Sequence, residues 1–315
     1  MGLAVPAAVM VATGRGARLG ILIRGGDALE RLARVGRMAF DKTGTLTFGR
    51  PVVQSAVSDD ALRWAAAVER YSEHPLAKGI LEEATRRGIA IGTATDFLAI
   101  PGEGVQGTVD GYRVAVGRHE QARVQVSVDG QSLGTIDFID EIRPEAVAAV
   151  SDLRALGIRP SLLSGDRSAA VGEVARVVGI DDFAAGLRPA EKLARIRGWQ
   201  QAGEVVAMVG DGINDAPALA QADAGIAMGT GTDIAREAAH VVLLSGQLER
   251  VARAIGLGRA AVAVMKQNLF WAMVYNAVAI PAAMLGLMSP VAASAAMALS
   301  SFSVVLNSLR LRRAG

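Results

Sequence analysis

An apolar run that ends at residue 40 is followed by a polar turn that contains glycine. Residues 35–40 are mostly apolar, which is typical of a short buried strand, and residues 41–47 read DKTGTLT. This pattern predicts that Asp41 lies at the carboxyl end of the strand, where open α/β sheets bind their ligands. A carboxylate there is a candidate nucleophile, because carboxylates form aspartyl-phosphates in ATPases. An ordinary surface turn is the alternative, since Asp, Gly and Thr are all common in turns.

Residues 144–245 alternate between apolar strand patterns and helical patterns. Such alternation predicts βαβ units and a parallel sheet, and right-handed crossovers bring the carboxyl ends of the strands to one edge. Three expected strand ends carry the motifs SGD, GDGINDAP and GTGTD, at residues 164–166, 210–217 and 229–233. We therefore expect polar side chains from distant segments to meet at this edge, namely Asp41, Ser164, Asp166, Asp211 and Asp215. For Asp166 and Asp233, a turn or a helix cap is an equally good interpretation.

The segment between these two parts has the pattern of an inserted α+β unit. Residues 51–143 combine two helical patterns with runs of alternating polarity, and the pair Asp129-Gly130 between two such runs is a strong hairpin signal. Two short motifs lie in this segment, SEHP at 72–75 and GEGV at 102–105. Taken alone, His74 is more simply a structural histidine, and the glycines indicate only a close approach to the backbone.

Two stretches near the C-terminus carry no charge and are long enough to span a bilayer. They cover residues 267–287 and 291–309, and a spanning helix needs roughly 20 residues. Arg259 and Lys266 precede the pair and three arginines follow it, which predicts that both ends of a hairpin face the cytosol. Buried core helices of a soluble protein are the alternative.

The charge balance and the lack of cysteine limit the possible partners. The chain has 33 basic and 31 acidic residues, a net charge of +2, which gives no reason to expect a nucleic-acid partner. It has no cysteine, so disulfides and thiolate metal ligands are excluded. Hydrophobic residues make up 51% of the chain, above the roughly 45–50% that is usual for soluble domains. This excess lies mostly near the two ends, which favours membrane segments.

Taken in order, these motifs resemble those of the P-type ATPases, and specifically of the heavy-metal-transporting subgroup that exports copper(I). The resemblance rests on DKTGT, SEHPLA, GEGV, SGD, the Pro189-x-x-Lys192 spacing and GDGINDAP. It implies a haloacid dehalogenase-like, doubly wound parallel sheet called the P domain, with an inserted α+β nucleotide-binding (N) domain and a C-terminal transmembrane hairpin. The implied segments are the end of a transmembrane helix at 1–13, a linker helix and first P-domain part at 14–50, the N domain at 51–143, the second P-domain part at 144–258 and two transmembrane helices at 267–309.

The resemblance also implies roles for the residues at the sheet edge. Asp41 attacks the γ-phosphate of ATP and becomes the aspartyl-phosphate. Mg²⁺ takes oxygen ligands, and Asp41, Asp211 and the backbone carbonyl of Thr43 are implied to bind it, with Asp215 as a neighbour. The remaining contacts to the phosphoryl oxygens are assigned to Lys192, Ser164 and Asn214. The residues implied to bind ATP in the N domain are Glu69, His74, Gly102 and Gly104.

The transported ion is assigned from polar residues in the two apolar stretches. Polar groups inside a membrane span are costly and usually functional. Met297, Ser300 and Ser301 are spaced three and four apart, so they lie on one helix face, and a thioether is a soft ligand that suits Cu(I). By resemblance, the copper(I) residues are Tyr275, Asn276, Met297, Ser300 and Ser301. Ag(I) is equally compatible with them, whereas Zn(II) is less so because 267–309 contains no Asp or Lys.

Several parts of the family's architecture are not found in this sequence, and we expect the chain to be a C-terminal piece. The actuator domain, the earlier transmembrane helices and the Cys-Pro-Cys ligands are missing, so we expect that it cannot pump alone. The implied setting is a bacterial plasma membrane with the P and N domains in the cytosol, and a copper chaperone as the donor of the ion. Two alternatives are a nucleotide-binding or regulatory fragment without transport and a soluble haloacid dehalogenase-type phosphatase.

Overall fold

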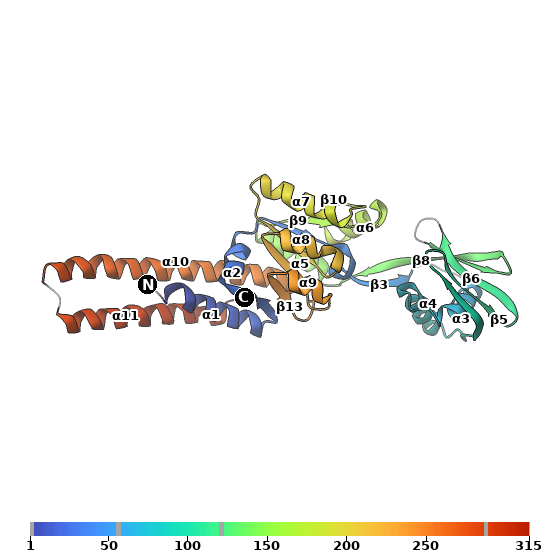
Figure 1. Ribbon diagram of the computed structural model, residues 1–315, viewed down its shortest axis with the longest axis horizontal. Coiled ribbons are helices and arrows are strands. Elements are labelled where there is room, and N and C mark those ends of the chain that lie inside the picture. Colours follow the sequence, from blue (N-terminus) through green and yellow to red (C-terminus); the bar gives the residue numbers. More distant parts are fainter. Residues whose placement is uncertain (1–2, 55–57, 120–122, 287–288, 315) are drawn as a thin grey trace. The chain divides into compact units, whose positions relative to one another are not determined.

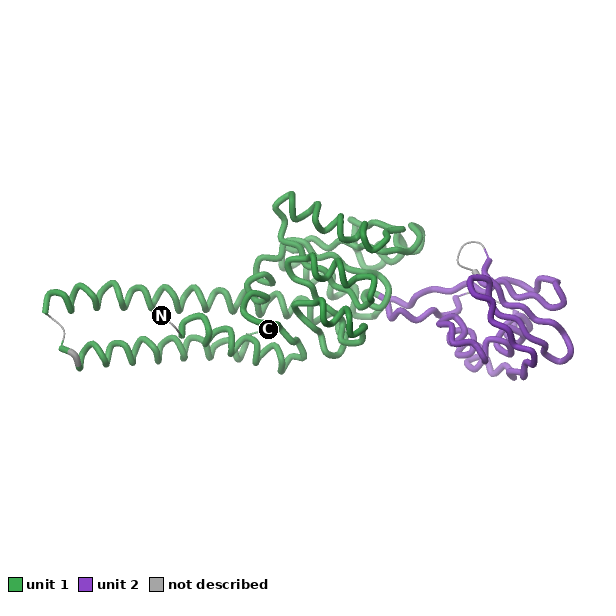
Figure 2. Tube along the Cα trace, in the orientation of Figure 1, with its two compact units in different colours: residues 1–46, 143–315 green, residues 47–142 purple. Residues whose placement is uncertain are grey.

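The computed structural model describes residues 3–54, 58–119, 123–286 and 289–314 (Figure 1). The outer ends of the predicted membrane segments 1–13 and 267–287, and two short parts of the predicted insertion, lie outside the described residues. Figure 2 shows two compact units: unit 1 joins Met1–Leu46 to Arg143–Gly315, and unit 2 is Thr47–Ile142.

Unit 1 is built on a seven-stranded sheet with the strand order β1-β13-β12-β11-β2-β9-β10. All neighbouring strands are parallel except β1, which pairs antiparallel with β13. Every residue of the three central strands is buried, as expected for a parallel sheet covered on both faces. The strands are β1 (Ile21–Ile23), β2 (Arg37–Phe40), β9 (Arg159–Leu163), β10 (Asp182–Ala184), β11 (Val206–Gly210), β12 (Ala224–Met228) and β13 (Val241–Leu243). This confirms the predicted doubly wound parallel sheet.

The helices of unit 1 connect these strands and extend beyond the sheet. Those around the sheet are α2 (Gly25–Arg34), α5 (Ala146–Ala155), α6 (Ser168–Val178), α7 (Pro189–Gln201), α8 (Ala216–Gln221) and α9 (Asp233–Ala238). Those that extend away from it are α1 (Ala4–Arg18), α10 (Glu249–Met284) and α11 (Pro290–Leu309). Three short helical turns complete the unit, η1 (Lys42–Leu46), η3 (Ile213–Asp215) and η4 (Arg310–Arg313).

Helix α10 is one continuous helix of 36 residues, and its two halves have different surroundings. Its first half packs on α2, where Gly258 allows the two backbones to approach closely. Its second half lies beside α11 (Figure 1). In the described part of the chain, one helix is long and apolar enough to cross a membrane, Val291–Arg313. Among the described residues, α10, which contains the predicted first span as far as Met284, does not meet that test.

Unit 2 is a six-stranded antiparallel sheet packed against two helices. The strand order is β3-β8-β7-β6-β5-β4. The elements are β3 (Thr47–Val53), α3 (Asp59–Glu69), α4 (Pro75–Arg86), β4 (Ala94–Ile100), β5 (Gly104–Val109), β6 (Tyr112–His119), β7 (Arg123–Val128) and β8 (Gln131–Ile142). Burial alternates along β5, as expected for a sheet with one covered face. Asp129 and Gly130 both have positive φ between β7 and β8, which is the conformation that the Asp-Gly pair favours in a tight hairpin.

A carboxylate on α4 makes the stability of unit 2 depend on pH. Glu83 is buried and accepts hydrogen bonds from Arg86 at 2.6 and 2.7 Å and from Arg87 at 2.7 Å. The hydrogen bonds from Arg86 are the main reason why the pKa of Glu83 falls to about 2 from its ordinary value of 4.5. Because the folded pKa is the lower one, this contribution to stability is complete above about pH 4.5 and is lost as the pH falls towards 2.

We therefore expect Glu83→Gln to raise the hydrogen exchange of the α4 amides at pH 6, and the difference from wild type to shrink as the pH falls from 5 to 3. Exchange of the full chain measured by mass spectrometry at each pH provides the comparison. Glu82→Gln is a suitable control, because the Glu82 side chain is exposed and lies 4.0 Å from Lys78. A difference that stays constant down to pH 3 would contradict the assigned pKa.

Candidate active site

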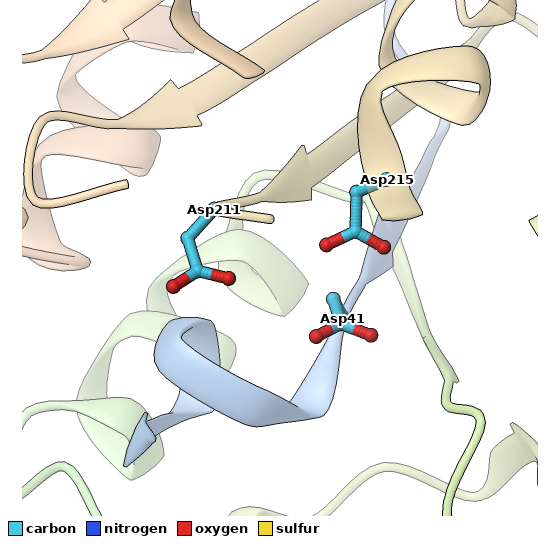
Figure 3. Close-up of side chains that lie close together, drawn as sticks. All are labelled: Asp41, Asp211 and Asp215. Carbon is cyan, nitrogen blue, oxygen red and sulfur yellow. The ribbon is translucent and has the colours of Figure 1, made fainter. Parts of the chain in front are cut away.

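Three carboxylates from two adjacent strands meet at one edge of the unit 1 sheet. Asp41 follows β2, and its backbone N–H donates to the carbonyl of Val209 on β11 at 2.9 Å. Asp211 follows β11 directly, and Asp215 ends the short turn η3. One carboxylate oxygen from each of the three lies within 4.8 Å of the other two. Figure 3 shows the three side chains facing a common space.

A single ammonium group connects two of these carboxylates. The Nζ of Lys192 donates to Asp41 and, at 2.8 Å, to Oδ1 of Asp215. Lys192 lies in the first turn of α7, whose two buried residues are Lys192 and Ile196, one turn apart. The side chain is 5% exposed. The helix therefore directs this cation into the sheet edge.

Burial and charge act in opposite directions on these groups. Burial is the main reason why the pKa of Asp41 rises to about 7, and the charge of Asp215 raises it further while Lys192 lowers it. Burial lowers the pKa of Lys192, but the charges of Asp41 and Asp215 outweigh it, so this pKa is raised and the ammonium form persists. When the three carboxylates are ionised, their negative charge is greater than the positive charge of the Lys192 ammonium group. This donor set, all oxygen and open to phosphate and water, fits a hard divalent cation such as Mg²⁺.

Two glycines make the position of Asp211 possible. Gly44 has φ +73°, and a Cβ on it would lie closer than 3.0 Å to the Asp211 carboxylate. On the other side, a Cβ on Gly231 would lie closer than 3.0 Å to the Asp211 backbone. The Thr232 N–H donates to the Asp211 carbonyl at 2.9 Å. The loops DKTGT and GTGTD thus enclose Asp211 from two sides.

The other residues that were predicted at this edge differ in how far they are buried. Ser164 follows β9 and is buried, and its hydroxyl accepts a hydrogen bond from the Asp166 N–H at 3.2 Å. Asp166 forms an ion pair with Lys42, the residue after Asp41. Asn214 and Thr43 are exposed. The edge therefore has a buried centre, made of Asp41, Asp215 and Lys192, and a rim that is open to a ligand.

Arg143 supports the back of the DKTGT turn, and the sequence analysis did not single it out. Its guanidinium is buried and donates to the Gly44 carbonyl at 3.1 Å and to the Gly246 carbonyl at 3.4 Å. Its backbone N–H donates to the Leu46 carbonyl at 2.9 Å. A charged residue directly after a long strand and before Pro144 was the available signal, but only the fold shows what it contacts.

The predicted nucleotide residues lie in unit 2, at the end of α3, the start of α4 and the β4–β5 turn. Glu69 is 6% exposed, and within the described residues its Oε2 atom has no hydrogen-bond partner. Burial raises its pKa, against a hydrogen bond with Ser72. His74 is the exposed N-cap of α4, and its Nδ1 accepts from the Leu76 N–H at 3.2 Å. A buried carboxylate oxygen without a hydrogen-bond partner is costly, so Oε2 of Glu69 is suited to a ligand that donates a hydrogen bond.

The two glycines of this turn, Gly102 and Gly104, have different surroundings. Gly102 has φ +83° and open space where a Cβ would lie. Gly104 has φ +145°, and a Cβ there would clash with the backbone of Val116 on the neighbouring strand. Tyr71 contacts Phe97 of β4 with ring centroids 5.8 Å apart, which brings the Glu69–His74 segment beside the β4–β5 pair. Gly104 is thus required by the sheet itself, whereas Gly102 leaves space at the surface.

Known proteins resemble this chain in sequence. A family model for haloacid dehalogenase-like hydrolases matches residues 37–223. A probable copper-exporting P-type ATPase V of Mycobacterium tuberculosis is 46% identical over 100% of this chain and 45% of its own length. A probable copper-transporting ATPase of Synechococcus elongatus is 43% identical, over 99% of this chain and 47% of its own. The chain belongs to the heavy-metal P-type ATPases.

Solved structures of this family match the fold closely. The crystal structure of a zinc-transporting PIB-type ATPase in its E2.Pi state matches with a TM-score of 0.87 and 37% identity, over 98% of this chain and 55% of that one. The catalytic domain of a CPx-ATPase, CopB-B, matches with a TM-score of 0.72 and 32% identity, over 78% of this chain and 98% of that one. The chain spans about half the length of the curated relatives it matches.

The predicted copper residues of this P-type ATPase chain lie on the exposed halves of α10 and α11. Met297 is 73% exposed and Tyr275 is 39% exposed. The Asn276 side chain donates to the Ala272 carbonyl of its own helix at 2.8 Å. The Ser300 carbonyl accepts from Ser303 at 2.8 Å. These side chains are therefore available to a ligand or another helix, and α10 and α11 do not enclose them.

A buried amide joins the three long helices. Asn268 of α10 is 1% exposed. Its Nδ2 donates to the Ala4 carbonyl of α1 at 2.9 Å and to Ser308 Oγ of α11 at 3.0 Å, and its Oδ1 accepts from Asn307 at 2.9 Å. In the absence of competing water, such bonds hold helices together.

We expect Asn268→Leu to destabilise the helical part by about 1–3 kcal/mol, because it removes hydrogen bonds to two other helices that each contribute about 0.5–1.5 kcal/mol. Asn276→Leu is the matched control, since among the described residues that amide bonds only to its own helix, at the Ala272 carbonyl. Thermal unfolding of the purified chain in detergent measures the difference. Equal melting temperatures for the two variants would show that the Asn268 contacts do not join the helices.

Proposed function

We propose that this chain forms the catalytic and C-terminal membrane part of an ATP-driven exporter of Cu(I) or Ag(I), acting through an aspartyl-phosphate on Asp41. The observation that carries the proposal is the buried Asp41–Lys192–Asp215 cluster with Asp211 beside it. A structural ion pair would not need a third carboxylate held at the open rim by two glycine loops. Perturbed, converging carboxylates at a strand edge are typical of catalytic sites.

In the proposed reaction, a carboxylate oxygen of Asp41 bonds to the γ-phosphorus of ATP while the bond between that phosphorus and the β,γ-bridging oxygen breaks, releasing ADP. Lys192 holds Asp41 in place and offers positive charge to the transferred phosphoryl oxygens. Ser164 and Asn214 supply hydrogen bonds to the same oxygens. When bound, Mg²⁺ would neutralise phosphate charge, and Asp41, Asp211 and the Thr43 carbonyl are the residues that would hold it, with Asp215 orienting the group.

For ATP itself, we propose that unit 2 is the nucleotide-binding domain. The unpaired Oε2 of Glu69 would accept a hydrogen bond from the adenine amino group. His74 would contact the same side of the base, and the surface at Gly102 and Gly104 would lie against it. The support is the unsatisfied buried carboxylate of Glu69 together with the open position at Gly102.

For the membrane part, we propose that α11 and the second half of α10 form a hairpin in a bacterial plasma membrane. Large apolar side chains are exposed along both helices, and in water such a surface would be a liability. Examples are Phe270, Trp271, Val278, Val291, Met297 and Phe302. With both basic ends in the cytosol, the P and N domains would also be cytosolic.

For the ion, we propose Cu(I) or Ag(I), taken from a copper chaperone and bound by Tyr275, Asn276, Met297, Ser300 and Ser301 with ligands from helices outside this chain. The support is the exposure of these groups, the soft thioether and the copper-exporting names of the relatives. Transport would also require the segments that the relatives have outside the matched region. Competition for Cu(I) with a chromophoric chelator tests the ligands, and unchanged affinity in Met297→Leu would remove Met297 from the set.

The test of the catalytic proposal is formation of an acid-stable, hydroxylamine-sensitive phosphoenzyme from γ-labelled ATP. We expect Mg²⁺-dependent label in the wild-type chain, none in Asp41→Asn, and normal label in Asp181→Asn, whose side chain is 95% exposed. Absence of label in all three would favour a fragment that only binds nucleotide. Hydrolysis of simple phosphate esters without label from ATP would favour the phosphatase alternative.

A further inference from the structure

Five arginines from two segments gather where the long helices leave the sheet. Arg15 and Arg18 lie in the last turn of α1, and η4 carries Arg310, Arg312 and Arg313. The Arg15 Nε donates to the Ala314 carbonyl at 2.9 Å, which joins the two segments. Leu311, which is buried in the core between α1 and α10, fixes η4 in place. We call these five residues the arginine cluster.

Within the described residues, the arginine cluster has no acidic partner. In the part of the chain that the structure describes, none of its members forms a salt bridge, and all except Arg15 are exposed. The sequence contains no Asp or Glu in residues 1–26 or 250–315, so α1, α11 and η4 carry no counter-charge. Arg310 donates only to the neutral Asn307 side chain at 3.2 Å. The positive charge is therefore available to an external anion.

The η4 arginines of the cluster lie next to the boundary between charged and apolar surface, and Arg15 joins them through Ala314. The hydrogen bond between Asn268 and Ser308 shows that these two positions of α10 and α11 lie side by side, at the same level along the two helices. On one side of this level, Lys266 and the arginines of η4 are exposed. On the other side, Phe270 and Trp271 are exposed and contact each other with ring centroids 5.5 Å apart. Trp271 lies three residues from Asn268, about 4.5 Å along the helix. Aromatic rings beside basic residues are typical of a membrane interface.

We propose that the arginine cluster is a binding site for the headgroups of anionic phospholipids in the cytosolic leaflet. This inference rests on the membrane hairpin of the proposed function. Guanidinium groups pair with phosphate oxygens through two parallel hydrogen bonds, and an uncompensated cluster of five selects lipids with net negative charge over zwitterionic ones. The bound headgroups would hold the end of α1 and η4 at the bilayer surface.

Trp271 provides a direct reporter, since the other two tryptophans, Trp64 and Trp199, lie in unit 2 and on α7. The full chain is reconstituted in phosphatidylcholine bilayers that contain a fixed fraction of shallow-brominated lipid, either phosphatidylglycerol or phosphatidylcholine. The Trp271→Phe variant gives the fluorescence of the other tryptophans, which is subtracted. We expect brominated phosphatidylglycerol to quench Trp271 more strongly than brominated phosphatidylcholine does. The binding constant of phosphatidylglycerol relative to that of phosphatidylcholine should be at least about five, which is the effect of one basic residue at an anionic surface.

Variants test whether the arginines cause the preference. Arg312→Gln/Arg313→Gln should bring the relative constant close to one, whereas Arg176→Gln/Arg195→Gln, which removes the same charge from exposed positions on α6 and α7, should leave it unchanged. At 1 M salt, where the Debye length is about 3 Å, the wild-type preference should largely disappear. Equal quenching by the two lipids in wild type, or equal loss in both double variants, would overturn the proposal. Absence of quenching by either lipid would instead refute the membrane hairpin, and the lipid site with it.

Discussion

Gly44→Ala is expected to reduce phosphorylation of Asp41 at least about 100-fold, the effect of displacing a catalytic group by 1 Å. A Cβ at residue 44 would lie closer than 3.0 Å to the Asp211 carboxylate, and the backbone there has φ +73°. The Asp211 backbone has little room to move, because Gly231 packs against it from the other side. The alanine therefore displaces either the proposed metal ligand Asp211 or the turn that carries Asp41. Acid-stable label from ATP, measured over a range of Mg²⁺ concentrations, gives the loss and shows whether the cation restores it.

The matched control is Gly36→Ala, just before β2. A Cβ at residue 36 would meet no heavy atom within 4 Å, and its φ is not positive. This variant should phosphorylate within about twofold of wild type, since it changes the same side chain without a clash. Normal phosphorylation in Gly44→Ala would mean that the contact between the DKTGT turn and Asp211 is not needed for the reaction.

Lys192→Ala should have the second large effect, on both stability and phosphorylation. Its ammonium group is the cation between Asp41 and Asp215, and removing one partner of a buried ion pair typically costs about 3–5 kcal/mol. The loss of its positive charge from the phosphoryl oxygens should also slow phosphorylation by about 10²–10³-fold, as for the loss of one oxyanion donor. Thermal unfolding and single-turnover labelling with ATP measure the two effects separately.

Affinity for Mg²⁺ distinguishes a role in catalysis from a purely structural one. Without Lys192, no ammonium group competes with Mg²⁺ for the carboxylate oxygens of Asp41 and Asp215, so Mg²⁺ should bind at least as tightly while labelling stays slow. Lys78→Ala, which removes a largely exposed lysine from α4, should change neither stability nor labelling. If high Mg²⁺ restored both stability and the labelling rate of Lys192→Ala, the lysine would serve only to balance charge.

Much of the sheet could be predicted because its central strands are buried on both faces and therefore appear as continuous apolar runs. The strands β1, β10 and β13 have three residues each and were not predicted, since so short a segment shows no period. The sequence predicts a membrane-spanning segment at 267–287, yet the helix that contains it, α10, is continuous from Glu249. Its charged first half and apolar second half look like separate elements in sequence, and packing on α2 and α1 is what keeps them in one helix.

The amino-acid sequence by itself determined which carboxylates share an edge, because parallel strands end on one side and Asp41 and Asp211 each follow such a strand. Through its resemblance to a known family, it also assigned Lys192 to the same site, as a contact to the phosphoryl oxygens. Only the tertiary structure decided that Lys192 connects Asp41 to Asp215, that Arg143 holds the Gly44 carbonyl, and that the arginines of α1 and η4 form one cluster. The physical reason is that strand periodicity is a local property of the chain. A contact between side chains far apart in sequence depends instead on how closely whole helices and loops pack.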